Sequence, residues 1–280
     1  MVELKRINVI LSSIDVFINN YINEQINNKK ISNRDPKIKA KDRNEAKNVP
    51  LDTLINYNKV LKENCSTSEK YIKEVIEAVK SLDASYIVLR LKLESNLLTG
   101  WSPLYFIDEV PTAWDLILDV PYIPGTTIKG LIRSSFAFAI HDSAKEKKIF
   151  GDKGEVGGAI FLDAYPVKCD DGILIKEVMT PHYKKGIKTE FDATPIPIIF
   201  AAVKKGTEFK TAILFDDELS EELILDAARA VGFASRYGVG RKTTRGYGKF
   251  SVDVSVDVED VKLNKKSSSE NQIKAGGVKP

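Results

Sequence analysis

The sequence predicts an α+β protein, in which an antiparallel sheet carries helices and a helical layer precedes the sheet. Segments of alternating apolar and polar residues, typical of strands, recur along the chain, and Phe250 to Val258 is the clearest of them. Segments with apolar residues at three- and four-residue steps, typical of helices, lie between them. The order from residue 85 onward is strand, helix, strand, strand, helix, strand. This is the order of a ferredoxin-like (RRM-like) βαββαβ unit.

Residues 1–82 are predicted to form the helical layer. The first helix has an apolar face made of Leu4, Ile7, Leu11, Ile14, Ile18 and Tyr21. A short second helix is expected at residues 51–61, and a third is expected to start at the capping box Ser66–Glu69. Residues 27–48 lie before the second helix and hold eight cations against three acids, which is typical of a mobile basic loop. The cations are Lys29, Lys30, Arg34, Lys37, Lys39, Lys41, Arg43 and Lys47.

Residues 83–260 are predicted to form the sheet domain. Its first strand covers residues 85–93, and its first helix follows Pro124 with a threonine as the cap. Further strands are expected at residues 159–164, 198–203, 209–215 and 250–258, and the second helix starts at Ser220 with acidic residues in its first turn. Residues 168–197 are rich in Lys and Pro and predict an inserted loop or hairpin. Residues 261–280 are polar and predict a disordered tail.

Two helices on one face would leave the other face of the sheet free to meet a ligand, as in RNA-recognition modules. The net charge of +3 is too small to indicate a nucleic-acid partner by itself, because the position of the charges decides binding. Cys65 and Cys169 are far apart in sequence, so neither a disulfide framework nor a Cys/His metal cluster is predicted, and a reducing compartment is favoured. No signal peptide or membrane span is recognised, which predicts a soluble, cytoplasmic protein without membrane contact.

The first motif covers residues 123–133 and starts the first helix of the sheet domain. A helix N-terminus presents unpaired N–H groups and a partial positive charge, so it can hold an anion. Gly125 leaves room for a close approach, and Thr126 and Thr127 add hydroxyl groups. Lys129 and Arg133 are four residues apart and lie together on the helix. These groups can hold a phosphate. The alternative is a capped core helix with two solvated cations, and spacing alone favours that alternative.

The second motif covers residues 238–250 and has four glycines in eleven residues. Glycines such as Gly240 let a backbone turn sharply and lie close to a ligand. Arg241, Lys242 and Arg245 supply positive charge, and Tyr247 can stack on a base. The loop lacks the ending of a nucleotide P-loop. The alternative is a plain turn that needs glycine, but three cations and no acid favour a ligand.

Together the two motifs resemble the RAMP superfamily of CRISPR-associated proteins. That family has an Ile-Pro-Gly-Ser/Thr-Ser/Thr-Leu/Ile-Lys-Gly-x-Leu/Ile-Arg helix start and a glycine-rich loop near the C-terminus, which residues 123–133 and 238–250 match. Within the family, residues 157–166, 178–183 and 195–200 are similar to the subunits that stand sixth in the type III-B (Cmr) effector complex. The resemblance covers residues 85–258.

The resemblance implies a non-catalytic RNA-binding subunit of a type III-B CRISPR RNA-guided complex for antiviral defence. Such a subunit holds the 3′ region of the guide RNA and the guide–target duplex. Its expected partners are guide RNA, target RNA and other RAMP subunits of the Cmr complex. Cleavage of the target in this family comes from an acidic loop of a different, repeated subunit, so no catalytic residue and no cofactor is expected here.

His182 lies in a basic segment and is predicted to contact RNA together with Tyr183, Lys184 and Lys185. Some RAMP proteins cleave RNA without metal, using a histidine as general acid or base. A metal-independent endoribonuclease that processes CRISPR RNA is therefore the alternative function, and a free-standing RNA-binding module is a third. RNA contact or surface exposure of His182 is favoured over catalysis. The other histidine, His141, is read as structural.

The remaining candidates carry more than one interpretation. The acid pairs at residues 170–171 and 216–217 can in principle hold Mg²⁺, but adjacent acids are more often caps and turn residues, so no metal is predicted. The basic residues 29–47 are either a third RNA contact or a solvated loop. Residues 179–197 are expected to project and touch the guide–target duplex. The two motifs are expected to form one continuous phosphate-binding surface that contacts RNA without reading its sequence.

Overall fold

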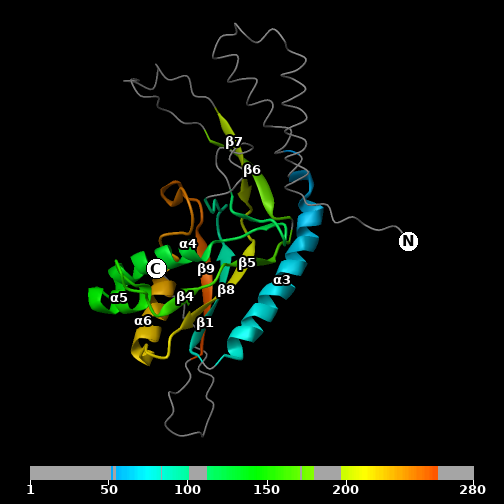
Figure 1. The fold of residues 1–280 in the computed structure, drawn as a ribbon. Helices are drawn as coiled ribbons and strands as arrows, with labels where there is room; N and C mark the ends of the chain where they lie inside the picture. The colour runs from blue at the N-terminus through cyan, green and yellow to red at the C-terminus, as the bar shows by residue number, and fades with distance from the viewer. Residues whose placement is uncertain are drawn as a thin grey trace, which may run out of the picture.

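The computed structural model describes residues 52, 55–82, 84–100, 112–170, 172–179 and 197–257. Their centre is an antiparallel sheet of five strands, in which the order β4-β8-β1-β9 forms the main path and β5 also pairs with β8. The strands are β1 (Tyr86–Leu93), β4 (Ala159–Phe161), β5 (Tyr165–Lys168), β8 (Glu208–Phe215) and β9 (Phe250–Asp257). Strand β1 therefore lies between β8 and β9, although the three are far apart in the sequence (Figure 1).

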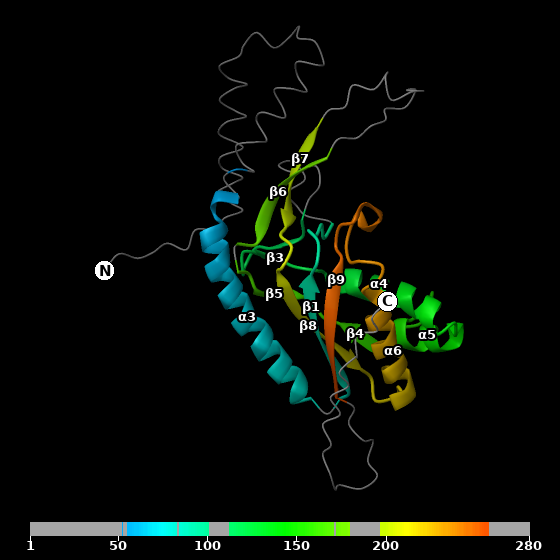
Figure 2. The same ribbon diagram turned by 180° about the vertical axis from the view of Figure 1, so that it is seen from behind.

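Helices cover both faces of this sheet. On one side lie α4 (Gly125–Ala139), α5 (Ser143–Phe150) and α6 (Glu221–Ala234), and on the other side lies α3 (Asn58–Lys80) (Figures 1 and 2). Strand β1 shows how the sequence sets these layers, because successive side chains of a strand point to opposite faces. Ile87, Leu89, Leu91 and Leu93 join the core that α4 and α6 build, whereas Tyr86 and Val88 pack with α3.

The prediction of an open sheet face is wrong in the part of the sheet that α3 covers. Ile72, Ile76 and Val79 of α3 form one apolar cluster with Tyr86 of β1 and Ala212 of β8. The first half of β1 is apolar on both faces, so its second face also has to be buried, whereas Arg90 and Lys92 further along β1 stay exposed. The helical layer before the sheet domain is therefore the cover of that face.

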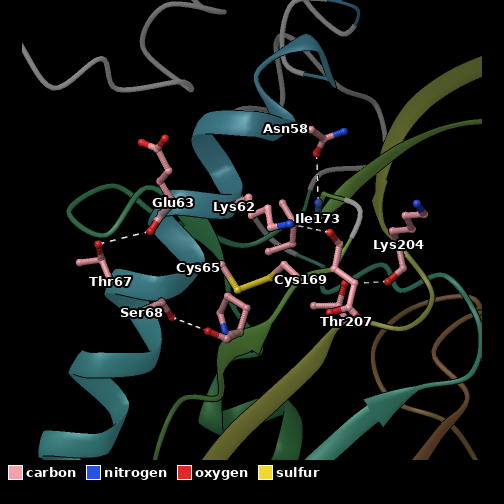
Figure 3. Close-up of a disulfide and its surroundings, with 12 residues drawn as sticks. Asn58, Lys62, Glu63, Cys65, Thr67, Ser68, Cys169, Ile173, Lys204 and Thr207 are labelled. Carbon is pink, nitrogen blue, oxygen red and sulfur yellow. Dashed lines mark hydrogen bonds between the residues drawn. A yellow bond between two sulfur atoms is a disulfide. The ribbon is translucent and has the colours of Figure 1, made fainter.

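Helix α3 is one helix of 23 residues, where the sequence predicted two. The capping box is wrong, because Ser66 and Thr67 lie inside the helix and not at its start. Thr67 Oγ1 donates to the Glu63 carbonyl, one turn earlier (Figure 3). Ser68 is fully buried and its Oγ donates to the Pro166 carbonyl of β5 at 2.9 Å. Ser68 therefore connects α3 to β5 and does not mark a helix start.

A disulfide between Cys65 of α3 and Cys169, just after β5, corrects the prediction that the two cysteines stay unpaired (Figure 3). The residues are 104 positions apart, but the packing of α3 on the sheet brings their Cα atoms to 6.5 Å. The argument for a reducing compartment rested on unpaired cysteines and therefore loses its basis.

Two smaller sheets lie outside the main one. Strands β6 (Leu174–Met179) and β7 (Ile198–Val203) pair antiparallel, and β2 (Trp114–Asp115) pairs with β3 (Val120–Pro121). The sequence predicted β7, but it left β6 inside an irregular stretch and did not identify β5 or α5. A small apolar cluster of Leu98, Met179, Phe200 and Ala202 packs the β6–β7 hairpin against the segment that follows β1.

The predicted mixed class with antiparallel strands is confirmed, and β1, α4, β7, β8, α6 and β9 lie within a few residues of their predicted bounds. The predicted first helix, the basic loop at 27–48 and the C-terminal tail lie outside the described residues. Among the described helices, none is both long enough and apolar enough to cross a membrane.

Candidate nucleic-acid interface

The glycine loop, defined here as residues 238–248, joins α6 to β9 (Figure 2). It closes on itself, because the Val239 amide donates to the Gly248 carbonyl at 2.8 Å. All four of its glycines have positive φ, and a Cβ on Gly248 would overlap the Val239 carbonyl oxygen. A short 3₁₀ helix, η3 (Thr243–Arg245), forms its tip. The loop is therefore a closed turn whose shape requires glycine.

The glycine loop is also docked on the segment after β1. The Arg241 amide donates to the Leu98 carbonyl at 2.7 Å, and the Gly248 amide donates to the Asn96 carbonyl at 2.8 Å. A Cβ on Gly240 would overlap the Leu98 carbonyl oxygen. The sequence suggested that glycine allows a ligand to approach the backbone. At Gly240, the group that approaches is the protein's own chain.

Tyr247, predicted to stack on a base, is half-buried at the inner side of the loop. Its ring packs 6.3 Å from that of Phe200, and its hydroxyl donates to a carboxylate oxygen of Glu177 on β6 at 3.3 Å. Burial raises the pKa of the Tyr247 hydroxyl, and the nearby Glu177 carboxylate raises it further. The ring is thus engaged within the protein, which leaves less of it for a base.

The arginines of the described residues divide into two groups. Arg90, Arg133 and Arg229 each pair with a carboxylate, at 2.8, 2.6 and 2.9 Å. The other three, Arg236, Arg241 and Arg245, have no ion pair within the part of the chain that the structure describes, and all three lie in or just before the glycine loop. Arginine is the side chain best suited to phosphate, because its planar fork donates several hydrogen bonds.

Lys242 adds a fourth cation at the tip of the loop, where its backbone is left-handed with a φ of 57°. It too has no ion pair to a described residue. Arg236 was missed in the sequence, although it stands two residues before Gly238. The signal that could have identified Arg236 is that no acid occurs between Asp226 and Asp253, so the cations before the loop belong with those inside it.

The N-terminus of α4 differs from its prediction. The first helical residue is Gly125, and neither Thr126 nor Thr127 caps the helix. Instead the Gly125 amide donates to Oδ1 of Asp163 at 2.6 Å. Gly125 is buried, and a Cβ there would overlap the Phe161 carbonyl oxygen. A carboxylate of the protein itself therefore occupies the amide at which a phosphate was expected.

The two cations of α4 also differ from each other. Arg133 Nε donates to Glu146 of α5 at 2.6 Å, so its charge is already balanced. Lys129 is half-buried and has no ion pair to the described residues. Of the predicted phosphate site on α4, Lys129 and the exposed Thr126 are the groups left available.

Short contacts connect the glycine loop to the start of α4. The Arg241 side chain lies beside Gly100, and the neighbouring Thr99 Oγ1 accepts from the Ala113 amide at 2.7 Å. The Ala113 carbonyl in turn accepts from the Tyr122 amide at 3.1 Å, three residues before α4. The two motifs thus belong to one connected region. That they contact the same RNA strand stays a prediction.

The remaining predicted contacts, His182, Tyr183, Lys184 and Lys185 and the cations of residues 29–47, lie outside the described residues. His141 is described and exposed, and it follows α4 with a φ of 56°. The Asp216 side chain accepts from the Glu218 amide at 3.2 Å, as a turn residue does. The described residues contain no group of three or more His, Cys, Asp or Glu that could hold a metal ion.

Comparison with known proteins gives matches along the whole sheet domain. A family model described as the RAMP superfamily matches residues 90–251, more than half of the chain. The CRISPR system CMR subunit Cmr6 of Saccharolobus solfataricus is 27% identical over 258 residues, covering 86% of this chain and 88% of that protein. The CRISPR system Cmr subunit Cmr6 of Pyrococcus furiosus is 26% identical over 273 residues, covering 72% and 77% respectively.

Among solved structures, a chain in the cryo-EM structure of the type III-B Cmr-beta bound to cognate target RNA matches with a TM-score of 0.74. The match covers 91% of this chain and 94% of that chain at 24% sequence identity. At this identity the match is evidence about the fold, and it extends over nearly the whole length of both chains.

Proposed function

The chain belongs to the RAMP superfamily, and from this premise we propose that it is an RNA-binding, non-catalytic subunit of a type III-B CRISPR effector complex. Two curated relatives are Cmr6 subunits, and a solved structure that shares its fold contains target RNA. In this role it holds the 3′ region of the guide RNA and the guide–target duplex, and it contacts other RAMP subunits of the Cmr complex.

The observation that carries the proposal is the group of arginines at the glycine loop. Arg236, Arg241 and Arg245 have no carboxylate partner in the described part of the chain, whereas the other three described arginines do. Three arginines within ten residues that lack a carboxylate partner suit a polyanion that neutralises them. RNA phosphates provide that charge at regular spacing, and Arg binds them through paired hydrogen bonds.

The core order β1-α4-β4-β8-α6-β9 supports a ferredoxin-like reading of the domain. The strand order β4-β8-β1-β9, with every neighbouring pair antiparallel, is what that unit produces. In this reading the glycine loop leads into the last strand, and the β6–β7 hairpin is an insertion between the second and third strands. We propose that residues 179–197, which connect β6 to β7, reach the guide–target duplex.

The test is RNA affinity at several salt concentrations for Arg236→Ala, Arg241→Ala and Arg245→Ala. Log affinity falls as log salt rises, and each lost phosphate contact on single-stranded RNA should make this fall less steep by about 0.7. The change should be the same for every RNA sequence, because phosphate contacts do not read bases. Arg229→Ala is the matched control, because Arg229 is on α6 and 69% exposed but pairs with Asp226. Unchanged slopes in the three folded variants would remove the glycine loop from the RNA site.

The absence of catalysis is part of the proposal and needs its own experiment. The purified chain is incubated with labelled CRISPR repeat RNA in the presence of a chelator. We expect intact RNA. Cleavage that disappears in His182→Ala would overturn the proposal in favour of a metal-independent endoribonuclease. Co-purification with other Cmr subunits separates an assembled subunit from a free-standing RNA-binding module.

A further inference from the structure

An exposed aromatic cluster lies where the C-terminal ends of α4 and α6 meet. It consists of Phe138 on α4, Phe233 in the last turn of α6, and Tyr237 three residues after the end of α6. Phe138 is 59% exposed and Tyr237 is 43% exposed. The ring centroids are 5.6 Å apart between Phe138 and Tyr237, and 5.8 Å apart between Phe233 and Tyr237. Two large aromatic side chains are therefore exposed to water and in contact with each other.

A cation accompanies these rings. The guanidinium of Arg236 lies over the Phe233 ring, 4.8 Å from its centroid, and Arg236 has no ion pair within the described residues. The cation–π contact holds the side chain beside the cluster without neutralising its charge. Tyr237 is followed directly by Gly238, so the cluster stands at the root of the glycine loop.

The charge of both contributing segments is positive. Between Asp226 and Asp253 the sequence holds six Lys or Arg and no Asp or Glu, and no acid occurs between Asp119 and Asp142 on the α4 side. The next acid after α4, Asp142, accepts from the amides of Ala144 and Lys145 and so caps α5. A partner that lies on these rings meets cations and aromatic faces. A polyanion that carries flat aromatic groups fits both features.

We propose that Phe138 and Tyr237 form a stacking platform for unpaired bases of an RNA strand whose phosphates lie along the glycine loop. The proposal rests on the proposed RNA-binding function and names its substrate class as single-stranded RNA. Base stacking on aromatic side chains tolerates every base, because each has a π face. The arginines of the glycine loop bind the RNA backbone, and the platform of Phe138 and Tyr237 binds an adjacent unpaired base. Tyr237, at the root of the glycine loop, takes the role that the sequence suggested for Tyr247.

The experiment compares two RNA probes of equal length and charge, an oligouridine of twenty nucleotides and its fully abasic counterpart. Stacking predicts that Tyr237→Ala and Phe138→Ala each weaken oligouridine binding by about 5- to 100-fold. It predicts no loss with the abasic strand and an unchanged salt slope, since no phosphate contact is removed. Tyr237→Phe keeps the ring and should bind as the wild type does. Tyr71→Ala, which removes a 41% exposed tyrosine from α3, is the matched control.

The possible results of this experiment distinguish the stacking platform from the RNA-binding function on which it rests. If Arg241→Ala lowers the salt slope while Tyr237→Ala and Phe138→Ala bind oligouridine normally, RNA binding stands and the platform is wrong. Equal losses on the normal and abasic strands would also refute stacking. If both alanine variants keep RNA affinity but no longer co-purify with Cmr subunits, the cluster is a protein interface. A wild-type chain that does not bind oligouridine at any salt concentration would overturn the function and the platform together. Thermal melts identify any variant that fails to fold.

Discussion

At the scale of single residues, Asp163 shows how a side chain from another element completes a helix. Its Oδ1 accepts from the Gly125 amide at 2.6 Å, which satisfies one of the free amides of α4. We expect Asp163→Ala to lower the free energy of unfolding by about 1 kcal/mol, as other helix caps do. Asp163→Asn keeps an acceptor oxygen and should lose less. Urea denaturation measures both, and equal stability of Asp163→Ala and the wild type would show that the cap is dispensable.

Gly240 provides a second test, with Gly246 as its matched control. Both have positive φ, at 85° and 89°, so alanine strains the backbone at either site. A Cβ at Gly246 would meet open space, whereas one at Gly240 would overlap the Leu98 carbonyl oxygen. We expect Gly240→Ala to cost about 1–3 kcal/mol more stability than Gly246→Ala. Denaturant midpoints give the difference, and equal losses at both sites would mean that the overlap relaxes freely.

These residues also show what the sequence could and could not supply. The glycines and cations of residues 238–248 were found because composition and spacing are local. The reason for Gly240 was not, because the carbonyl that crowds it belongs to Leu98, far away in the sequence. The same applies to Tyr247, whose partners Phe200 and Glu177 come from other strands. A local pattern identifies a special residue, but its contacts depend on the tertiary fold.

At the scale of elements, Glu177 joins the β6–β7 hairpin to the glycine loop. One of its carboxylate oxygens accepts from the Asn96 side-chain amide, and the other accepts from the Tyr247 hydroxyl at 3.3 Å. We expect Tyr247→Phe to loosen the hairpin selectively, because the ring still packs on Phe200 and only the hydrogen bond is lost. A hydrogen bond to a charged group contributes about 1.5–3 kcal/mol, less where water reaches it.

Hydrogen exchange tests this coupling. Amides of β6 and β7 should exchange faster in Tyr247→Phe, while those of β1, β8 and β9 keep their protection. Glu177→Gln removes the charge but keeps an acceptor oxygen, and should have a smaller effect. Faster exchange throughout the main sheet would contradict a local coupling and indicate a general loss of stability.

Elements were predictable where their periodicity is long. Strand β9 alternates over eight residues, and α4 and α6 each hold several turns of an apolar face. Strand β5 spans four residues and includes Pro166, and β6 places Lys176 and Glu177 in its centre, so neither gave a clear pattern. Helix α5 is short, and a contact with another helix stabilises it, since Lys145 donates to Asp226 of α6 at 2.8 Å. Its stability comes from tertiary contacts more than from its own sequence.

At the scale of the whole molecule, α3 decides which surfaces are available to a ligand. It lies across the face opposite α4 and α6 and packs on Tyr86 of β1 and Ala212 of β8 (Figures 1 and 2). The layer order was not predictable, because a capping-box pattern divided α3 and because β1 is apolar on both faces only in its first half. With part of that face covered, the described arginines that have no ion pair, Arg236, Arg241 and Arg245, lie just after α6 and in the glycine loop.

The last prediction concerns the attachment of α3 to the sheet. One helical face carries three hydrogen-bonding residues and a cysteine at three- or four-residue spacing (Figure 3). Asn58 binds the backbone of Leu174, Lys62 donates to the Asp170 carbonyl, Ser68 donates to the Pro166 carbonyl, and Cys65 forms the disulfide. The disulfide closes a loop of 104 residues, and long loops lose the most entropy in the unfolded chain when they are closed. We expect reduction to lower the free energy of unfolding by about 2–4 kcal/mol.

Denaturation of the oxidised and reduced wild type measures this loss, with a Cys65→Ala/Cys169→Ala variant that should not respond to reducing agent. RNA affinity should be the same in both redox states, because the hydrogen bonds of Asn58, Lys62 and Ser68 still hold α3 in place and the glycine loop contacts other segments. Identical midpoints for oxidised and reduced protein would mean that these hydrogen bonds and the apolar contacts of α3 suffice. A fall in RNA affinity on reduction would instead mean that the cover over the sheet helps to shape the proposed RNA site at the glycine loop.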